Sequence, residues 1–360
     1  MIYRRTALLS IVVVALAAGG CWGSGDRTSG TGGSAGAGGT GGATGAGGTV
    51  ADGPSGLPVP PGGGVARPGG TPGDVTVLDW AGFKAAVSYT FDDTNSSQIS
   101  NYAMLNGLGV RMTFYLITNK TNDFNNAVWM QALQDGHELG NHTRSHQMTG
   151  TAADVDAGDT DIENKFGITV YTMAAPYGDP SYVSLASTRY LVNRGVNDGQ
   201  IAPNGTTDPF NINCYIPAEN APAATMNANI DALRSAGRWK TVLVHGFTGG
   251  SDGAYMPVAI GELVSHVNHV KELGDVWIDS VVNVAAYWRG QKSFAAITPT
   301  TSGNSKTWTW TLPDHFPPGK YLRVKVDGGT LTQPGGKTLT WDDHGYYEVA
   351  LDAGSLTLAP

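Results

Sequence analysis

Short apolar runs alternate with stretches of helical periodicity from about residue 75 to residue 291. The apolar runs, quoted in chain order, are "AAVSYTF", "VRMTFYLI", "TVYTMAAPYG", "YLVNRGVN", "TVLVHG" and "DVWIDS". The helical stretches between them cover residues 96–107, 154–166, 226–237 and 257–273. Repeated strand-helix alternation predicts an α/β fold with a parallel sheet. Six or seven such units favour a (β/α) barrel, in which the chemistry lies at the carboxyl ends of the strands.

After Gln291 the pattern changes to period-two alternation with Gly and Pro turns. The runs "TWTWTL", "KYLRVKV", "KTLTW" and "YYEVAL" are typical of short strands, so residues 292–360 are predicted to form a small C-terminal all-β module. Five aromatic residues could form either the core of this module or a platform on which a sugar stacks: Trp308, Trp310, Tyr321, Trp341 and Tyr347. Core packing is the commoner role of aromatic residues in a short β module.

Residues 1–21 have the layout of a secretory signal. Arg4 and Arg5 precede an apolar run over residues 7–18, which is too short to span a bilayer. The segment ends in "LAAGGC", which resembles the lipobox of bacterial lipoproteins, in which the cysteine, here Cys21, is lipidated and becomes the new N-terminus. The alternative is an ordinary cleaved signal peptide. Either interpretation predicts an exported protein.

Residues 22–74 are predicted to be a flexible tether. Nearly all of them are Gly, Ser, Thr, Ala and Pro, a composition that buries too little apolar surface to offset its conformational entropy. Such a tether would hold the following domain, predicted at residues 75–291, away from a membrane surface to which a lipidated Cys21 is attached.

Charge and cysteine content restrict the partners and the kind of metal site. The net charge is −8 and no basic run is present, which argues against nucleic acid as a partner. The two cysteines, Cys21 and Cys214, allow no disulfide framework and no thiolate cage for zinc. Any metal must therefore be bound by histidine and carboxylate.

The segment "GHELGNHTRSH", residues 136–146, is compatible with two different metal sites. The H-E-x-x-H helix of metalloproteases needs histidines four residues apart, but His137 and His142 are five apart. His142 and His146 are four apart, and side chains at that spacing on a helical turn can share one ion. We therefore predict that this pair binds the metal, and that His137 and Glu138 belong to the scaffold.

The first strand ends in "TFDD" and leads directly into "TNSS". At a strand end the chain can turn and bring Asp92 and Asp93 into one pocket. A cation that neutralises one carboxylate would let the other ionise near neutral pH and act as a base. The alternative is an acidic pair that caps the next helix.

Four motifs follow one another, each at a predicted strand end or in the loop after it: "TFDD", then "HTRSH", then "APYG", then "LVH". Together and in this order they resemble the NodB-homology polysaccharide deacetylases, carbohydrate esterase family 4, over residues 85–290. The resemblance implies a distorted (β/α) barrel of about seven units, followed here by the small β module. It also implies an acetylated polysaccharide of the chitin, peptidoglycan or acetyl-xylan type as substrate.

The resemblance further implies a role for each matching residue. Asp93, His142 and His146 match the metal-binding triad of the family, for which zinc is the expected ion, with cobalt or nickel as possible substitutes. Asp92 matches the general base that takes a proton from water.

The last two motifs carry the remaining roles. His245 matches the general acid that protonates the departing nitrogen or oxygen. The backbone N–H of Tyr177 matches the donor that stabilises the oxyanion of the tetrahedral intermediate.

The chain departs from the family pattern at two places. Ala174 stands where the family usually has the arginine that steadies the base, and Arg194, at the end of the next predicted strand, is a candidate to replace it. The aspartate that usually orients the acid histidine is not obvious, with Asp198 and Asp275 both as candidates.

Two other classes of function remain open at this point. "GGSDG" at residues 249–253 matches the G-x-S-x-G motif of serine esterases, although Ser251 lies past the strand in a glycine-rich loop. A surface lipoprotein that only binds glycan through a degenerate deacetylase fold is the other alternative. His266 and His269, three apart on a predicted helix, are expected on its solvated face.

Overall fold

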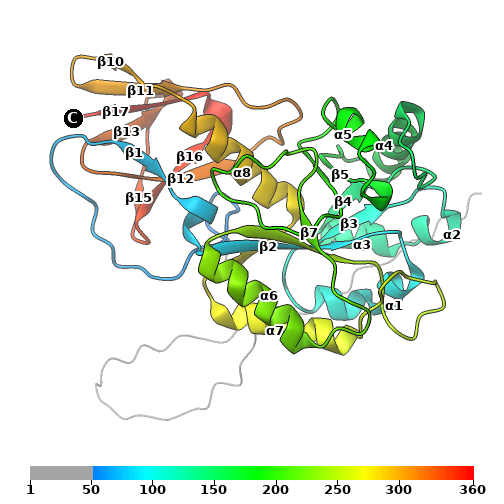
Figure 1. Cartoon of the computed structure of the whole chain (residues 1–360). Helices are drawn as coiled ribbons and strands as arrows, with labels where there is room; N and C mark the ends of the chain where they lie inside the picture. The colour runs from blue at the N-terminus through cyan, green and yellow to red at the C-terminus, as the bar shows by residue number, and fades with distance from the viewer. Residues whose placement is uncertain (1–51) are drawn as a thin grey trace, which may run out of the picture. The chain divides into compact units, whose positions relative to one another are not determined.

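Seven parallel strands form an almost closed barrel in the computed structural model, which describes residues 52–360. The strands are β2 (Ala85–Phe91), β3 (Thr113–Leu116), β4 (Glu138–Asn141), β5 (Thr172–Ala174), β6 (Val192–Arg194), β7 (Cys214–Tyr215) and β8 (Trp239–Val244). Their order is β6-β5-β4-β3-β2-β8-β7, and a parallel bridge between Arg194 and Ile212 joins β6 to the segment that leads into β7. One more strand, β9 (Val276–Ile278), pairs with the first half of β2. The predicted distorted (β/α) barrel is confirmed (Figure 1).

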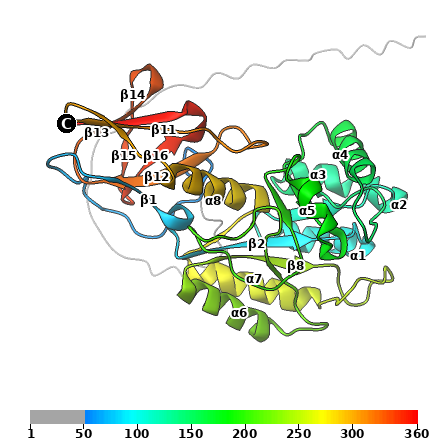
Figure 2. The ribbon, with the colours of Figure 1, turned by 45° about the horizontal axis from the view of Figure 1, so that its top comes forward.

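The barrel strands are connected by helices on the outside of the sheet. These are α1 (Ser96–Asn106), α2 (Thr121–Phe124), α3 (Val128–Gln134), α4 (Ala152–Phe166), α5 (Ser181–Ala186), α6 (Ala223–Ala236), α7 (Ile260–Leu273) and α8 (Val281–Ala295). The four predicted helices correspond to α1, α4, α6 and α7, whereas the sequence pattern did not indicate the other four. Figures 1 and 2 show α6 and α7 side by side along β2 and β8.

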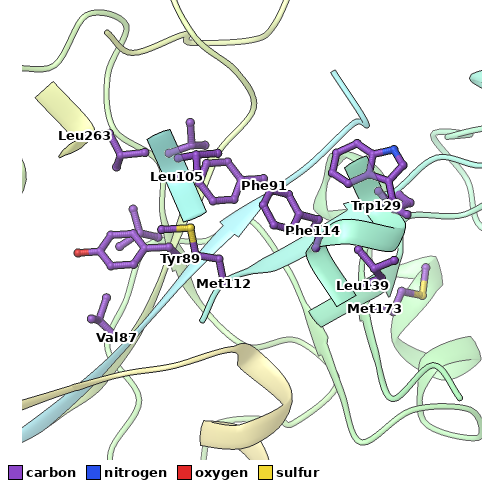
Figure 3. Packing of buried hydrophobic residues seen from close by; sticks show 14 of the residues in the cluster. Val87, Tyr89, Phe91, Leu105, Met112, Phe114, Trp129, Leu139, Met173 and Leu263 are labelled. Atoms are coloured by element: carbon purple, nitrogen blue, oxygen red, sulfur yellow. The ribbon is translucent and has the colours of Figure 1, made fainter. Parts of the chain in front are cut away.

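Every residue of β2 and β8 is buried, because a parallel strand in a barrel is covered on both faces. The sheet and the outer helices share one apolar core, in which Phe91 stacks on Phe114 at 5.1 Å between ring centroids. Figure 3 shows Phe91 of β2 and Phe114 of β3 side by side, with Trp129 of α3 and Leu139 of β4 nearby. This core fixes the strand ends that carry the polar motifs.

The C-terminal region consists of two antiparallel sheets. One contains β1 (Val75–Val77), β12 (Tyr321–Val326), β16 (Tyr346–Ala350) and β15 (Trp341–Asp342). The other contains β10 (Thr300–Ser302), β11 (Ser305–Thr309), β17 (Ser355–Ala359), β13 (Thr330–Gln333) and β14 (Lys337–Thr338). The predicted strand-rich module is therefore present, and it also takes its first strand from the N-terminal side of the barrel.

Helix α8 connects the barrel to these sheets through a shared apolar core. Its Tyr287 and Trp288 pack in one cluster with Trp277 of β9 and with the inward residues of β12 and β17. The helix continues to Ala295, so the expectation that helices end at Gln291 was wrong, because Phe294 still packs on Trp308 of β11. Of the five aromatic residues of the module, Trp308, Trp310 and Tyr347 are buried core, whereas Tyr321 and Trp341 are partly exposed.

Part of the predicted tether lies on the folded domain. The carboxylate of Asp52 pairs with Arg111 at 2.7 Å, and Leu57 is buried. The guanidinium of Arg323, fully buried, donates to the carbonyl oxygens of Leu57 and Pro58. A buried guanidinium needs hydrogen-bond acceptors, and the carbonyl oxygens of Leu57 and Pro58 are two of them. The composition of residues 22–74 did not indicate this contact. Asp52, Leu57 and Pro58, which the prediction assigned to the tether, therefore contact the folded domain.

Residues 1–51, with the predicted signal and Cys21, lie outside the described residues. Within residues 52–360, no helix has the length and apolar character needed to cross a membrane.

The expectation of a solvated face for the histidines of α7 was wrong for His266. Its imidazole is fully buried, with Nε2 3.0 Å from the hydroxyl of Tyr89 and Nδ1 2.7 Å from Oδ1 of Asn227. His266 therefore satisfies polar groups between α6, α7 and the barrel, whereas His269 remains partly exposed beside Asp231.

Candidate active site

The predicted site residues lie at the carboxyl ends of neighbouring strands. Asp92 and Asp93 follow β2, His142 follows β4, Arg194 ends β6 and His245 follows β8. Tyr177 lies in the short turn of residues Pro176–Gly178 after β5. In a parallel barrel these ends open on one face, so motifs that are far apart in sequence meet there.

Asp93, His142 and His146 form a compact cluster of possible metal ligands. One ligand atom from each lies within 4.8 Å of the other two. Oδ1 of Asp93 is 3.4 Å from Nε2 of His142 and 3.4 Å from Nε2 of His146, yet no described group donates to it in hydrogen-bond geometry. An acceptor that is buried without a donor, between two imidazole nitrogens, fits a cation.

The turn that presents His146 is not helical, contrary to the expectation from the spacing of four. Thr143 and His146 have φ values of 65° and 53°, in the left-handed region. The hydroxyl of Thr143 accepts from the backbone N–H of His146 at 2.9 Å, and Asp154 at the start of α4 accepts from Ser145. A bent loop, held by side-chain hydrogen bonds, therefore brings the two imidazoles to 4.7 Å between centroids.

Each imidazole of the cluster has its orientation and protonation set by its surroundings. Nδ1 of His142 lies 2.8 Å from the carbonyl oxygen of Ala174, which leaves Nε2 directed at the aspartates. Burial, helped by the charge of His142, lowers the pKa of His146 to about 4, so this ring is neutral at pH 7. Burial would raise the pKa of Asp93, but the nearby imidazole of His142 and its charge outweigh burial and hold that pKa well below its usual range. Burial would lower the pKa of His142, but the charges of Asp92 and Asp93 raise it, so a metal must displace a proton from this ring. Neutral imidazole and ionised carboxylate are the forms that bind metals.

Asp92 and Arg194 form a buried ion pair beside the cluster. Asp92 is 2% exposed and Arg194 is fully buried, and a terminal guanidinium nitrogen of Arg194 donates to Oδ2 of Asp92. The other oxygen of Asp92, Oδ1, has no partner within the described part of the chain. The same guanidinium donates to the carbonyl of Gly195 at 2.9 Å and lies 5.5 Å from the centroid of the Tyr115 ring.

Arg194 lies where it can take the place of the arginine that is missing at position 174. The two residues are register partners in the parallel pair β5–β6, so their side chains enter the barrel at the same level. Both are fully buried. The guanidinium that the family places on one strand therefore comes from the next strand in this chain.

His245 lies on the same face but has no orienting carboxylate. Its Nδ1 is buried and lacks a hydrogen-bond partner among residues 52–360. The candidate Asp198 pairs instead with Lys240 at 2.9 Å, and Asp275 pairs with Arg234 at 2.5 Å. Burial lowers the pKa of His245, although the negative charges of Asp92 and Asp93 act against it.

The backbone of His245 is held from α1. Its carbonyl oxygen accepts from the side-chain amides of Asn95 at 2.8 Å and Gln98 at 2.7 Å. Sequence reasoning missed both residues, although "TNSS" with the glutamine after it was visible as a capping segment. Asn95 also accepts from Lys120 at 2.8 Å.

Tyr177 has a φ of 58°, and its ring is 57% exposed with its centroid 4.6 Å from that of His146. The ring of Tyr177 therefore lies against one histidine of the metal cluster. The role of its backbone N–H as a donor to a reacting oxygen stays a prediction.

His137 and Glu138 lie at the opposite ends of the strands, where β4 begins. Nδ1 of His137 accepts from the backbone N–H of Met112 at 3.0 Å, and burial lowers its pKa to about 4. Glu138 accepts from Thr113 at 2.8 Å and from the backbone N–H of Val282 in the first turn of α8 at 2.9 Å. Both side chains satisfy structural donors, as scaffold residues do.

The serine-esterase alternative lacks the local structure it requires. Ser251 is exposed in the loop between β8 and α7, which begins only at Ile260. Its neighbour Asp252 caps α1 by accepting from the backbone N–H of Ser97 at 2.7 Å. A nucleophile elbow needs a tight strand-to-helix turn, which this loop does not form.

A barrel with a carboxylate and histidine cluster at the carboxyl ends of its strands has the layout of a barrel enzyme. Comparison with protein families identifies the class: residues 82–194 match the family described as "Polysaccharide deacetylase". Residues 82–194 are therefore similar to polysaccharide deacetylases, as the motifs indicated, and enzymes of that family are hydrolases of amide or ester bonds. The matched segment includes the aspartate pair, both cluster histidines and Tyr177, and it ends at Arg194, before His245.

Solved structures with a similar chain path share little sequence with this protein. A family 4 acetyl xylan esterase from Clostridium thermocellum, in complex with cobalt, is 17% identical over 55% of this chain and 89% of its own, with a TM-score of 0.39. The catalytic domain of a peptidoglycan N-acetylglucosamine deacetylase from Eubacterium rectale is 16% identical over 58% of this chain and 93% of its own, with a TM-score of 0.40. A comparison with curated proteins gave no match.

Proposed function

We propose that this protein is a metal-dependent deacetylase that hydrolyses N- or O-acetyl groups of a polysaccharide outside the cytoplasm. The observation that carries the proposal is the cluster of Asp93, His142 and His146 next to the buried Asp92–Arg194 pair. Two histidines and one carboxylate leave coordination positions open, as a catalytic site requires.

The residues around the cluster supply the proton transfers. Asp92, with its free Oδ1, is the base that takes a proton from the attacking water, and Arg194 holds its other oxygen in place. His245 gives a proton to the departing nitrogen or oxygen of the sugar. The N–H of Tyr177 donates to the oxygen that becomes negative in the tetrahedral intermediate.

A divalent ion at the cluster would supply Lewis-acid polarisation of the acetyl carbonyl and of water. Zinc is the ion proposed, because neutral imidazole and carboxylate suit it well, and cobalt or nickel accept similar ligands. The donor-free Oδ1 of Asp93 supports a cation at this place.

We further propose that the protein is an exported lipoprotein of the cell envelope, attached to a membrane through a lipidated Cys21. The support is the signal-like segment ending in "LAAGGC" and the Gly-rich stretch after it.

Acetate release tests the catalytic proposal. Purified protein is assayed on N-acetylated chito-oligosaccharides, peptidoglycan and acetyl-xylan, first with chelator and then after addition of zinc or cobalt. We expect release from at least one glycan, abolished by chelator and restored by metal. Release that persists in the metal-free protein would contradict the metal dependence. Binding of a glycan without release by any metal-loaded form would favour the non-catalytic alternative.

A further inference from the structure

One large aromatic side chain on the catalytic face lies outside every motif used so far. Tyr255 is 58% exposed, and its ring stands perpendicular to that of His245, at an interplanar angle of 89° and a centroid distance of 5.3 Å. Few large apolar side chains of residues 52–360 are as exposed. An exposed aromatic residue beside a candidate catalytic group commonly marks a contact with a ligand.

The loop that carries Tyr255 is fastened at both ends. Its base is closed by a parallel bridge between Phe247 and Val258, and Asp252 accepts from the backbone N–H of Ser97 at the start of α1. The hydroxyl of Ser97 also accepts from the backbone N–H of Phe247 at 3.0 Å. The ring is thus held in place by its loop, although its own surface is mostly in water.

Two glycines let this loop approach α1 closely. A Cβ at Gly246 would lie 2.6 Å from the hydroxyl oxygen of Ser97, and one at Gly250 would lie 2.9 Å from the Cβ of the same residue. The motif "GGSDG" is therefore the part of this loop that packs against the start of α1.

The place of Tyr255 follows from the chemistry of the leaving group. In deacetylation the atom protonated by His245 stays on the sugar, so a pyranose ring must lie against His245 when the acid acts. Tyr255 is the exposed apolar surface beside that imidazole. The C–H face of a pyranose is itself apolar and stacks on aromatic rings.

We propose, on the basis of the function proposed above, that Tyr255 is a sugar-binding platform on which the pyranose that carries the acetyl group stacks. The ligand class is a neutral β-linked pyranose chain, of N-acetylhexosamine or of O-acetylated pentose units. Tyr177, the other exposed aromatic residue at the site, packs on His146 and not on His245.

The test separates sugar binding from catalysis. Metal-loaded wild type, Tyr255→Ala and Tyr255→Phe are titrated calorimetrically with xylotetraose and with chitosan tetraose, the tetramer of unacetylated glucosamine, which carry no acetyl group and cannot react. We expect Tyr255→Ala to weaken the Kd of one of these two probes about tenfold, the size of one lost aromatic stack, and Tyr255→Phe to keep it. The probe affected identifies the pentose or the hexosamine chain.

A kinetic arm uses acetylated tetrasaccharide and phenyl acetate, a small ester without a sugar. We expect the ratio of kcat/KM for the tetrasaccharide to kcat/KM for the ester to fall about tenfold in Tyr255→Ala. Met104→Ala, at an exposed position of α1, is the matched control and should keep the Kd and the ratio of wild type.

A folded Tyr255→Ala protein with the Kd of wild type for both probes would overturn the platform. If Tyr255 only positioned His245, kcat would fall while both Kd values stayed unchanged, which also refutes the platform. Absence of acetate release by wild type from every glycan would instead refute the proposed function, and the Kd values would still decide whether Tyr255 holds a sugar.

Discussion

Replacing Arg194 by Met tests whether the ion pair with Asp92 holds the site together. The substitution keeps a long side chain but removes the charge from a position that is fully buried, and it leaves Asp92, 2% exposed, without its cationic partner. Breaking a buried pair by removing one partner costs about 3 to 5 kcal/mol of the free energy of unfolding. The nearest other positive group is the imidazole of His142, 3.6 Å away, which is a poor substitute because it is needed at the metal cluster.

Urea unfolding of the chelated protein measures this cost without the contribution of bound metal. A double-mutant cycle with Asp92→Asn then isolates the pair, since the variant that lacks both charges should lose less stability than the sum of the two single variants. A loss below about 1 kcal/mol in Arg194→Met, or a coupling close to zero in the cycle, would refute the reasoning.

The register between β5 and β6 extends this prediction. Ala174→Arg alone would place a second guanidinium at a position that is fully buried. The substitution should therefore destabilise the protein by about 1 to 3 kcal/mol through overpacking. Combined with Arg194→Ala, the same substitution should recover part of the acetate release lost in Arg194→Ala alone, because the two side chains enter the barrel at one level. No recovery by the folded double variant would show that the strand of origin matters.

Three further predictions concern the metal, acid stability and anchoring. His142→Ala should lose both bound zinc and acetate release, whereas His137→Ala should keep its metal; elemental analysis after gel filtration checks this, and stoichiometric zinc in His142→Ala would count against the cluster. Because the folded pKa of His137, about 4, lies below its ordinary value, its contribution is present above about pH 6.5 and is lost as the pH falls toward 4. Urea unfolding of wild type should therefore show an acid-side loss of about 3 kcal/mol that His137→Gln lacks, and parallel pH curves would contradict it. Cys21→Ala should move the protein to the soluble fraction and abolish labelling by a fatty-acid probe, and unchanged labelling would exclude lipidation at Cys21.

The sequence by itself determined the barrel and the kinds of side chain at the carboxyl ends of its strands. The mainly apolar runs of β2 and β8, and the helical periodicity of α1, α4, α6 and α7, are local patterns, because neighbouring residues show whether a segment is buried on both faces or along one stripe. Asp92, Asp93 and His245 stand at the ends of predicted strands, so a parallel sheet brings them to one face whatever the details of packing, whereas His142 follows β4, a strand that the sequence pattern did not indicate.

Only the tertiary structure decided which backbone conformation and which partner residues hold these side chains in the site. The spacing of His142 and His146 suggested a helix, but a bent loop with left-handed residues joins them, because Asp154 of α4 holds that loop through space. The arginine missing at position 174 comes from Arg194 through strand register, a relation between segments that no local pattern encodes. The same holds for Leu57, whose carbonyl serves a guanidinium on β12: a contact over more than two hundred residues depends on the packed fold, which composition does not specify.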